Sequence, residues 1–345
     1  MATVHRLAWN DRGVARLWDE FVFQCPTATF FHRSGWQSIL HNVFHHPTYY
    51  LFLEDAGKIR GVLPLAHISS LIFGRSLISL PFAVYGGPAA EDETVSSRLE
   101  EAACALAQEL GVSNLELRNR EKRNFDWPSQ DIYFTFRRKL FDGSEENLNA
   151  IPRKQRAMIR KGIKGKLVSR NDTDPSVFFS LYSDNMHRHG TPPHSKVYFE
   201  SLMKEFGRDC RILTVSDQLG EPLSSVLSFY FRDEVLPYYA GDSVFARSSA
   251  ANDFKYWELM SQSISEQVRT FDFGRSKICS GSFSFKKNWG FEPQPLSYEF
   301  CLYGRDQIPQ NNPANSRFRV LIEAWKKMPN SFTNVVGPHI VRSIG

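Results

Sequence analysis

The sequence predicts an α/β (α+β) protein built from two tandem copies of one supersecondary unit. Its 345 residues are enough for about two domains. Hydrophobic residues make up 42% of the chain and charged residues 23%, which is the balance of an ordinary globular protein. The order strand, hairpin, strand, helix, strand occurs twice, at corresponding positions of the two halves. A repeat of this length indicates a duplicated domain rather than a solenoid.

The first copy begins with a helix after Ser34, a residue type that favours helix N-caps. Two apolar runs on either side of a polar turn, in residues 49–65, form a hairpin signature. A further strand is expected to end at residues 85–88. Residues 91–110 carry apolar side chains at helical spacing and predict a helix, and the alternating residues 114–118 predict the strand that follows it.

The second copy repeats this order. Residues 211–231 contain two apolar runs around a polar turn and predict a hairpin. A strand is expected to end at residues 239–242, and a helix is expected over residues 252–268. The alternating residues 270–274 predict the strand after that helix. The pattern therefore matches the first copy element by element.

This pattern suggests a division into three parts. We expect a first unit at residues 1–150 and a second unit at residues 151–304, facing each other across one cleft. Residues 305–345 are expected to form a C-terminal tail with a short helix near residues 318–327.

Charge and cysteine content set limits on the compartment and the partners. The net charge of +5 permits an anionic ligand without requiring one. The five cysteines include no C-x-x-C pair, which favours a reducing compartment over a disulfide framework. The first twenty residues lack the apolar segment of a signal peptide, and no apolar run is long enough to span a bilayer. We therefore expect a cytoplasmic protein without a transmembrane segment.

One segment carries a specific resemblance to a known family. Residues 283–291 read FSFKKNWGF and resemble the FK-x-x-(F/W)-G signature of the FemAB family, whose members add amino acids to peptidoglycan precursors. Weaker similarities to the family pattern occur at residues 85–91, 153–166 and 188–199. Together with residues 271–277, FDFGRSK, the set is similar to FemAB-related proteins of PEP-CTERM and exosortase systems. The resemblance runs from about Phe30 to Leu302.

The resemblance implies a fold and an activity. It implies two tandem GNAT-like domains of the acyl-CoA N-acyltransferase type. It also implies an acyltransferase that forms an amide bond, transferring an aminoacyl group to a cell-envelope or exopolysaccharide precursor. Two alternatives stay open, namely an acyl-CoA-dependent GNAT N-acyltransferase and a non-catalytic module that binds glycan precursors.

Three residues are candidates for the chemistry of amide formation, which needs a neutral amine and a stabilised oxyanion. Lys286 lies within the FK motif, and its ammonium could stabilise an oxyanion or bind a phosphate. Glu91 could hold the acceptor ammonium or take its proton. It could also be an ordinary acid in the first turn of a helix, where the helix dipole stabilises negative charge. Asp272 alternates with two phenylalanines and could face the cleft, or it could pair with Arg275.

A second group consists of candidates for substrate binding. Aromatic side chains suit clefts that hold sugars or peptides, and arginines suit anionic groups. The resemblance and the strand ends place these candidates at Tyr85, Arg188, Tyr198, Tyr239, Phe285, Trp289 and Arg275.

A third group would bind the acyl donor. GNAT enzymes carry a (Q/R)-x-x-G-x-(G/A) loop whose amides cradle the pyrophosphate of CoA, and Arg247, Ala250 and Asn252 form a degenerate version of it. A basic run over residues 153–166 contains no acid. It could be a solvated linker helix, or it could grip an anionic donor through Arg153, Lys154, Arg156 and Arg160.

The partners follow from these candidates. The donor is expected to be aminoacyl-tRNA or acyl-CoA, acting as a co-substrate, with no tightly bound cofactor. The resemblance implies a cell-envelope precursor as acceptor, tRNA as a partner, no DNA, and a peripheral position at the inner membrane. Histidines at positions 41, 45 and 46 have no acidic or cysteine ligand beside them, so we expect no metal site.

Overall fold

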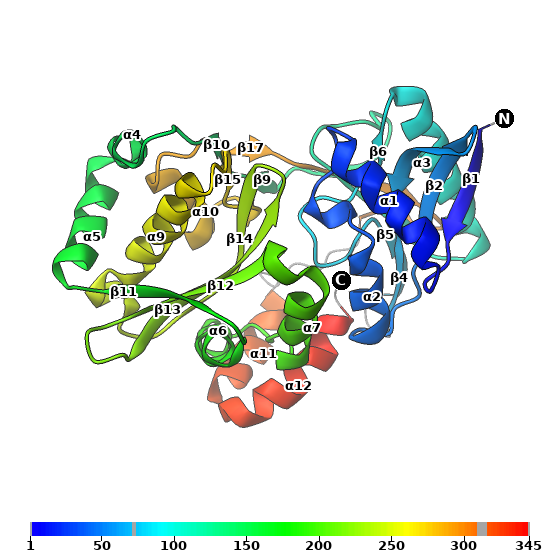
Figure 1. Cartoon of the computed structure of the whole chain (residues 1–345). Helices are drawn as coiled ribbons and strands as arrows, with labels where there is room; N and C mark the ends of the chain where they lie inside the picture. Colours follow the sequence, from blue (N-terminus) through cyan, green and yellow to red (C-terminus); the bar gives the residue numbers. More distant parts are fainter. Residues whose placement is uncertain (1, 71–73, 309–315, 344–345) are drawn as a thin grey trace. The chain divides into compact units, whose positions relative to one another are not determined.

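The computed structural model describes residues 2–70, 74–308 and 316–343 (Figure 1). The chain divides into two compact units. Unit 1 comprises Met1–Tyr133, Pro295–Asn311 and Arg342–Gly345, and unit 2 comprises Phe134–Gln294 and Asn312–Val341. The expected division assigned residues 134–150 to the first unit and residues 295–304 to the second, whereas in the structure they belong to the opposite units. Residues 309–315 of the expected tail lie outside the described residues.

Unit 1 contains two sheets, with strand orders β1-β2-β3-β6 and β4-β5-β7-β18-β8. The strands β5 and β7 are parallel neighbours, joined by a connection that contains the helix α3. The elements of this unit are β1 (Thr3–Leu7), α1 (Arg12–Gln24), α2 (Gly35–Asn42), β2 (Tyr50–Asp55), β3 (Lys58–Leu63), β4 (Ala66–Ser70), β5 (Gly74–Ile78), β6 (Ala89–Ala90), α3 (Glu93–Glu109), β7 (Asn114–Asn119), β8 (Ser129–Gln130) and β18 (Ser297–Leu302).

The helix α3 packs closely against the first sheet because Gly61 on β3 has no side chain. A Cβ atom at this position would lie 2.5 Å from Cγ1 of Val95 and 3.0 Å from Cδ1 of Leu99. The apolar face of α3 therefore reaches the sheet, and Leu99, Ala103 and Leu106 are buried in the core of unit 1.

Unit 2 is built around a six-stranded sheet with the order β10-β15-β14-β13-β12-β11. Helices α5 and α9 lie on one side of this sheet, and α6 and α7 lie on the other (Figure 1). The elements of this unit are β10 (Arg137–Lys139), α4 (Ser144–Ala150), α5 (Arg153–Lys164), β11 (Val168–Asp172), α6 (Ser176–His189), α7 (Lys196–Phe206), β12 (Cys210–Ser216), β13 (Pro222–Phe231), β14 (Glu234–Asp242), α8 (Ala246–Ser249), α9 (Ala251–Ser265), β15 (Thr270–Asp272), β16 (Ser276–Lys277), α10 (Gly281–Asn288), α11 (Ser316–Lys327) and most of α12 (Asn330–Arg342). Two short strands, β9 (Tyr133–Thr135) and β17 (Gln294–Pro295), span the unit boundaries.

The strands β14 and β15 pair over a short distance and then part. They are parallel, and only Glu234 and Val235 of β14 have partners on β15. The strand β14 continues to Asp242 while paired with β13, and its register shifts around Tyr238. A shift of this kind is a β-bulge, which bends a strand away from its neighbour. The second half of β14 is therefore unpaired on the β15 side.

Both units follow the expected order of hairpin, strand, helix and parallel strand, so the α/β fold class is confirmed. The prediction that a strand ends at residues 85–88 is wrong, because residues 79–88 lie outside the strands. Leu80 and Phe82 adopt positive φ values of 56° and 64°, which an extended strand does not allow. The segment instead folds back on β7, where the amides of Gly86 and Gly87 donate to the carbonyl of Arg118.

The sheet of unit 1 is completed by a strand from the far end of the chain. After the chain has formed the sheet of unit 2, β18 returns to unit 1 and pairs antiparallel with β7, from Ser297 opposite Asn119 to Leu302 opposite Asn114. The short strand β8 pairs with the other edge of β18. Unit 1 is therefore discontinuous in sequence.

Candidate active site

The FK motif forms the helix α10, which fixes one lysine and exposes the next. The hydroxyl of Ser280 caps the helix by accepting from the backbone N–H of Phe283 at 3.2 Å. The helix ends before Gly290, whose φ of 79° allows the chain to turn sharply. Lys286 is buried, whereas Lys287 is exposed.

The ammonium of Lys286 is held by two backbone carbonyl groups. Its Nζ atom donates to the oxygen of Gly274 at 2.9 Å and to that of Arg275 at 3.1 Å. The pKa of Lys286 is lowered to about 7, chiefly by burial; nearby Asp272 opposes this shift and Arg275 adds to it. Lys286 is thus a rigidly held amine that can change its charge near neutral pH.

Asp272 is fully buried on β15 and holds the same turn. One carboxylate oxygen accepts from the hydroxyl of Thr135 at 2.9 Å and from the N–H of Gly274 at 2.7 Å. The other oxygen lies 3.1 Å from Nε of Arg137. Asp272 therefore fixes the backbone that Lys286 contacts.

Aromatic rings support this cluster from the direction of α9. Trp289 is fully buried, and its indole N–H donates to Oδ1 of Asp253 at 3.0 Å. Burial raises the pKa of Asp253, and the bond from Trp289 opposes that shift. The ring of Tyr256 lies 5.5 Å from the Phe285 ring and 5.0 Å from the Phe273 ring. The FK motif is thereby packed against the start of α9.

An ion pair between a buried lysine and a half-buried aspartate joins the end of β14 to α9. The side chain of Lys255 is fully buried, and its Nζ atom lies 3.0 Å from Oδ1 of Asp242. The backbone carbonyl of Asp242 also accepts from Arg188 on α6. The only signal for this pair in the sequence is a lysine between aromatic residues of the predicted helix, and the sequence analysis missed it.

Two of the candidate tyrosines meet near the bulge of β14. The hydroxyls of Tyr198 and Tyr239 lie 3.0 Å apart. The His194 ring stacks on Tyr198 with ring centroids 4.5 Å apart, and burial lowers the pKa of His194 to about 3. Burial also raises the pKa of Tyr198. At neutral pH this cluster is uncharged, so it offers hydroxyl groups rather than ions.

A cavity of about 830 Å³ opens beside the loop after β14. Arg188 lines it, together with Lys161 and Lys164 of α5 and with Phe245. Of the three expected donor-loop residues, Arg247 is exposed, Asn252 is half-buried and Ala250 is buried, and none is among the lining residues. Ala250 adopts a left-handed conformation with φ 63° between α8 and α9, so the expected loop is partly helical.

The basic run forms the helix α5, which packs on α9. A Cβ atom on Gly162 would lie 2.8 Å from Cβ of Phe254, so only glycine allows this close approach. The candidate side chains on this helix differ in exposure. Arg153, Lys154 and Arg160 are exposed, whereas Arg156 is half-buried and donates to Asn149 at 3.0 Å.

The remaining two candidates lie in unit 1. Tyr85 is buried beneath the guanidinium of Arg120, whose Cζ atom lies 4.4 Å from the ring centroid. It lines a cavity of about 520 Å³. Glu91 is exposed, pairs with Arg60 at 2.6 Å and does not line this cavity. The acids that line it are Glu93, the first residue of α3, and Glu121.

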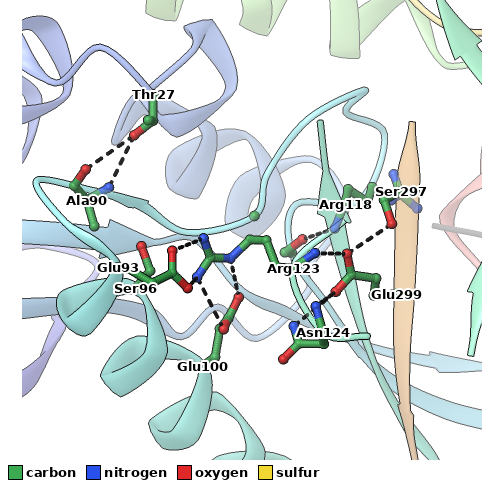
Figure 2. Close-up of polar contacts among 12 residues, drawn as sticks. Thr27, Ala90, Glu93, Ser96, Glu100, Arg118, Arg123, Asn124, Ser297 and Glu299 are labelled. Carbon is green, nitrogen blue, oxygen red and sulfur yellow. Dashed lines mark hydrogen bonds and ion pairs between the residues drawn. The ribbon is translucent and has the colours of Figure 1, made fainter. Parts of the chain in front are cut away.

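Glu299 anchors the loop that borders this cavity (Figure 2). Its buried carboxylate accepts from the backbone N–H of Arg123 at 2.8 Å and of Asn124 at 2.7 Å. The guanidinium of Arg123 in turn pairs with Glu93 at 2.8 Å and Glu100 at 2.7 Å on α3 (Figure 2). The loop is therefore fixed from both β18 and α3.

Within residues 2–70, 74–308 and 316–343, no three His, Cys, Asp or Glu side chains are grouped so that they could hold a metal ion. No helix in the described part of the chain has both the length and the apolar character needed to cross a membrane.

Residues 149–287 match the family model described as "Acetyltransferase (GNAT) domain". No curated protein sequence matches the chain. Among solved structures, the chain is similar to FemX, with a TM-score of 0.64 and 13% identity over 86% of this chain and 97% of that chain.

Two further structures share the fold. A tandem GNAT protein from the clavulanic acid biosynthesis pathway has a TM-score of 0.55 and 13% identity, over 89% of this chain and 100% of that chain. The C-terminal domain of a putative lysylphosphatidylglycerol synthetase from Agrobacterium fabrum has a TM-score of 0.54 and 12% identity, over 82% of this chain and 91% of that chain. At these identities the likeness concerns the fold. Residues 149–287 thus form a GNAT-type acetyltransferase domain, within a chain whose fold recurs in tandem GNAT proteins.

Proposed function

We propose that this GNAT-type acyltransferase forms an amide bond by transferring an aminoacyl group to a cell-envelope or exopolysaccharide precursor. The observation that carries the proposal is the buried Lys286, held by the carbonyls of Gly274 and Arg275. The fold likeness to FemX and to a putative lysylphosphatidylglycerol synthetase supports transfer of an aminoacyl or other acyl group. The resemblance of the FK motif to the FemAB family favours an aminoacyl group.

In the proposed reaction, the nitrogen of a neutral amine on the acceptor attacks the carbonyl carbon of an activated acyl ester. A new C–N bond forms, the C–O bond to the donor breaks, and the proton lost by the amine ends on the leaving oxygen of the donor. Negative charge develops on the carbonyl oxygen, and the ammonium of Lys286 would stabilise it. Glu91 is our candidate for holding the acceptor amine or taking its proton.

We assign Asp272 a positioning role. Its carboxylate fixes the N–H of Gly274, and Lys286 binds the carbonyl of the same residue. A change at Asp272 would therefore move the lysine rather than remove a reacting group. Phe285 and Trp289 support the same helix, and Arg275 lies beside the ammonium. Tyr85, Arg188, Tyr198 and Tyr239 remain our candidates for contacts with substrate.

A specific observation favours a second candidate, transfer from acyl-CoA. The strands β14 and β15 part after Val235, and GNAT folds admit the donor where these two strands separate. Arg247, Ala250 and Asn252 would then lie near the pyrophosphate. A non-catalytic module that binds glycan precursors is the third possibility, and it predicts that neither donor binds.

The donor test uses purified full-length protein. Thermal unfolding is followed with aminoacyl-tRNA, uncharged tRNA or acyl-CoA, at matched ionic strength. A ligand that binds the folded state raises the melting temperature. Aminoacyl-tRNA is expected to raise it more than uncharged tRNA does. Protection by acyl-CoA alone would favour the second candidate, and protection by none of them would overturn both.

The sequence resemblance supports further parts of the proposal. We propose a cytoplasmic protein that lies peripherally at the inner membrane and serves a PEP-CTERM or exosortase system. The activated donor would be a co-substrate, with no tightly bound cofactor. Growth phenotypes and extracellular polysaccharide in a deletion strain would test this assignment.

A further inference from the structure

The strand β18 and the helix α3 of unit 1 each carry a cysteine on the side that faces the other element. Cys301 of β18 lies opposite Leu115 of β7 in an antiparallel register. Residues that are opposite in such a pair point to the same face of the sheet. Leu115 is fully buried in the core cluster to which α3 contributes its apolar face, and Cys301 packs against this cluster. The side chain of Cys301 therefore points toward α3.

Cys104 of α3 meets this side chain. It packs against the same cluster, and the hydroxyl of Tyr303, two residues after Cys301, donates to its backbone carbonyl oxygen at 3.2 Å. The thiols of Cys104 and Cys301 share a hydrogen bond. The pKa of Cys104 is raised to about 12, chiefly by burial; Cys301 adds to this shift and the hydroxyl of Tyr303 opposes it. The two sulfur atoms are therefore neighbours.

A charged bridge one step away along both elements holds α3 and β18 in this register (Figure 2). Glu100 precedes Cys104 by about one helical turn and lies on the same face of α3. Glu299 precedes Cys301 by two positions and lies on the same face of β18. Arg123 joins the two acids, because its Nε atom donates to Glu100 at 2.7 Å and its backbone N–H donates to Glu299 at 2.8 Å. The two cysteines form the next connection between the same two elements.

The pair can be reached by a small molecule. Cys104 and Cys301 are partly exposed, whereas Cys25 and Cys210 are buried. A disulfide requires two cysteine side chains that are directed at each other, and this pair meets that condition while still reduced. In a reducing compartment, a disulfide that forms transiently usually serves redox sensing or catalysis. A partly exposed dithiol of this kind can therefore respond to an oxidant.

We propose that Cys104 and Cys301 form a redox-sensitive dithiol, which a small-molecule disulfide such as oxidised glutathione converts into an intramolecular disulfide. Cys301 reacts first, because the high pKa of Cys104 disfavours its thiolate. The thiolate of Cys301 attacks one sulfur of the oxidant, so that a mixed disulfide forms and one thiol leaves. Cys104 then loses its proton and attacks the sulfur of Cys301, which releases the second thiol. The two thiol protons of the protein end on the released thiols, and the oxidant gains the two electrons that the protein loses.

The disulfide would fasten β18 to α3. Glu299 lies on this strand and anchors the loop at the unit 1 cavity, so oxidation would fix that loop as well. A cross-link between residues 104 and 301 closes a long loop of the unfolded chain, and closing a long loop favours the folded state. The inference does not rest on the proposed transfer reaction, because it concerns only two thiols of unit 1.

The test uses the full-length protein, equilibrated at graded ratios of oxidised to reduced glutathione. Samples are quenched with acid, their free thiols are alkylated, and tryptic peptides are analysed by mass spectrometry. Cleavage after lysine and arginine places each cysteine on a peptide of its own. We expect peptides 99–118 and 288–305 to be joined by a disulfide. The oxidised protein should melt about 5 °C above the reduced protein.

Serine variants separate the two steps. Cys104→Ser should stop at the mixed disulfide on Cys301 and lose the rise in melting temperature. The matched control is Cys279→Ser, which removes an exposed cysteine of unit 2 and should keep both the cross-link and the rise.

In the wild type, Cys279 also shows that the oxidant is active, because this exposed thiol should form a mixed disulfide. The proposal is overturned if Cys279 is modified while peptides 99–118 and 288–305 stay separate, or if these peptides are joined only after unfolding in urea. This comparison needs only the wild type, so it decides the question even if a serine variant does not fold.

Discussion

Lys286 and Asp272 bind the two polar backbone groups of one residue, Gly274. The ammonium of Lys286 donates to the carbonyl oxygen at 2.9 Å, and the carboxylate of Asp272 accepts from the N–H at 2.7 Å. The lysine comes from α10 and the aspartate from β15, so this single residue couples the FK motif to the central sheet of unit 2. The position of the ammonium therefore depends on both elements.

Removing the ammonium should lower the rate of the chemical step. Lys286→Met keeps much of the side-chain length and is expected to reduce kcat about a hundredfold, corresponding to about 3 kcal/mol of lost oxyanion stabilisation. Lys286→Arg should restore only part of the rate, because a planar guanidinium differs in shape from an ammonium. The exposed neighbour supplies the control, and Lys287→Met should leave kcat unchanged. Equal losses for both variants would contradict the assignment.

The pH dependence should report the charge of Lys286. Burial lowers its pKa to about 7, so the ammonium is lost as the pH rises through neutrality. If the charged form stabilises the oxyanion, kcat should fall above about pH 7. Lys286→Arg should remove this falling limb, because guanidinium does not titrate in that range. A limb that persists in the arginine variant would assign the titration to another group.

The same shift should appear in the stability of the protein. The pKa of Lys286 is lower in the folded state than the 10.5 of an ordinary lysine, so the unfolded chain binds an extra proton between about pH 7 and 10.5. The contribution of this group to stability should therefore rise with pH in that range, by at most about 1.4 kcal/mol per pH unit. Urea unfolding of the wild type and of Lys286→Met at pH 6, 7, 8 and 9 measures it. A constant difference between the two proteins would show that the folded and unfolded pKa values agree.

The contact between α5 and α9 should tolerate no side chain at position 162. Gly162→Ala would place a methyl group 2.8 Å from Cβ of Phe254, and overpacking of this kind costs about 1–3 kcal/mol. Gly281→Ala is the matched control, because nothing lies within 4 Å of a Cβ there. Chemical denaturation of both variants compares the two sites. Equal stability of the two variants would mean that α5 can move away from α9 at little cost.

The exposed cations of α5 should contribute to binding of a polyanionic donor. Neutralising Arg153 and Lys154 together should weaken tRNA binding. It should also reduce the slope of log K against log salt concentration by the equivalent of about two phosphate contacts. The double variant of Lys204 and Arg208, two exposed cations at the end of α7 and just after it, controls for net charge. Filter binding across a series of salt concentrations gives both slopes. If the two double variants behave alike, α5 is a solvated helix.

Local periodicity accounts for what the sequence could predict of the fold. The hairpin at residues 49–65 became β2 and β3, and the helix at 91–110 became α3, because each needs only its own pattern and one buried face. The segment at residues 79–88 was mispredicted since its shape depends on hydrogen bonds to Arg118 on β7. Contacts between segments far apart in sequence leave no periodic signal.

The candidate site shows the same limit. The FK motif could be located from the sequence alone, and in the structure Lys286 is the buried lysine of that motif. Sequence analysis could not foresee that Arg137 pairs with Asp272, because β10 and β15 are neighbours in the sheet but lie far apart in the sequence. Whether Nδ2 of Asn119 and Nε of Arg120 find a hydrogen-bond acceptor likewise depends on their neighbours in space, which the sequence does not reveal.

The return of β18 to unit 1 has a consequence for synthesis on the ribosome. Strand β7 emerges long before β18, so one edge of the sheet stays unpaired while the six-stranded sheet of unit 2 is translated. An open edge is a template for pairing with other chains. Glu299, which anchors the loop at the unit 1 cavity, arrives on the same late strand. The nascent chain therefore completes the six-stranded sheet of its second unit before the sheet of its first, and the loop at the cavity in the first unit is anchored only after β18 has emerged.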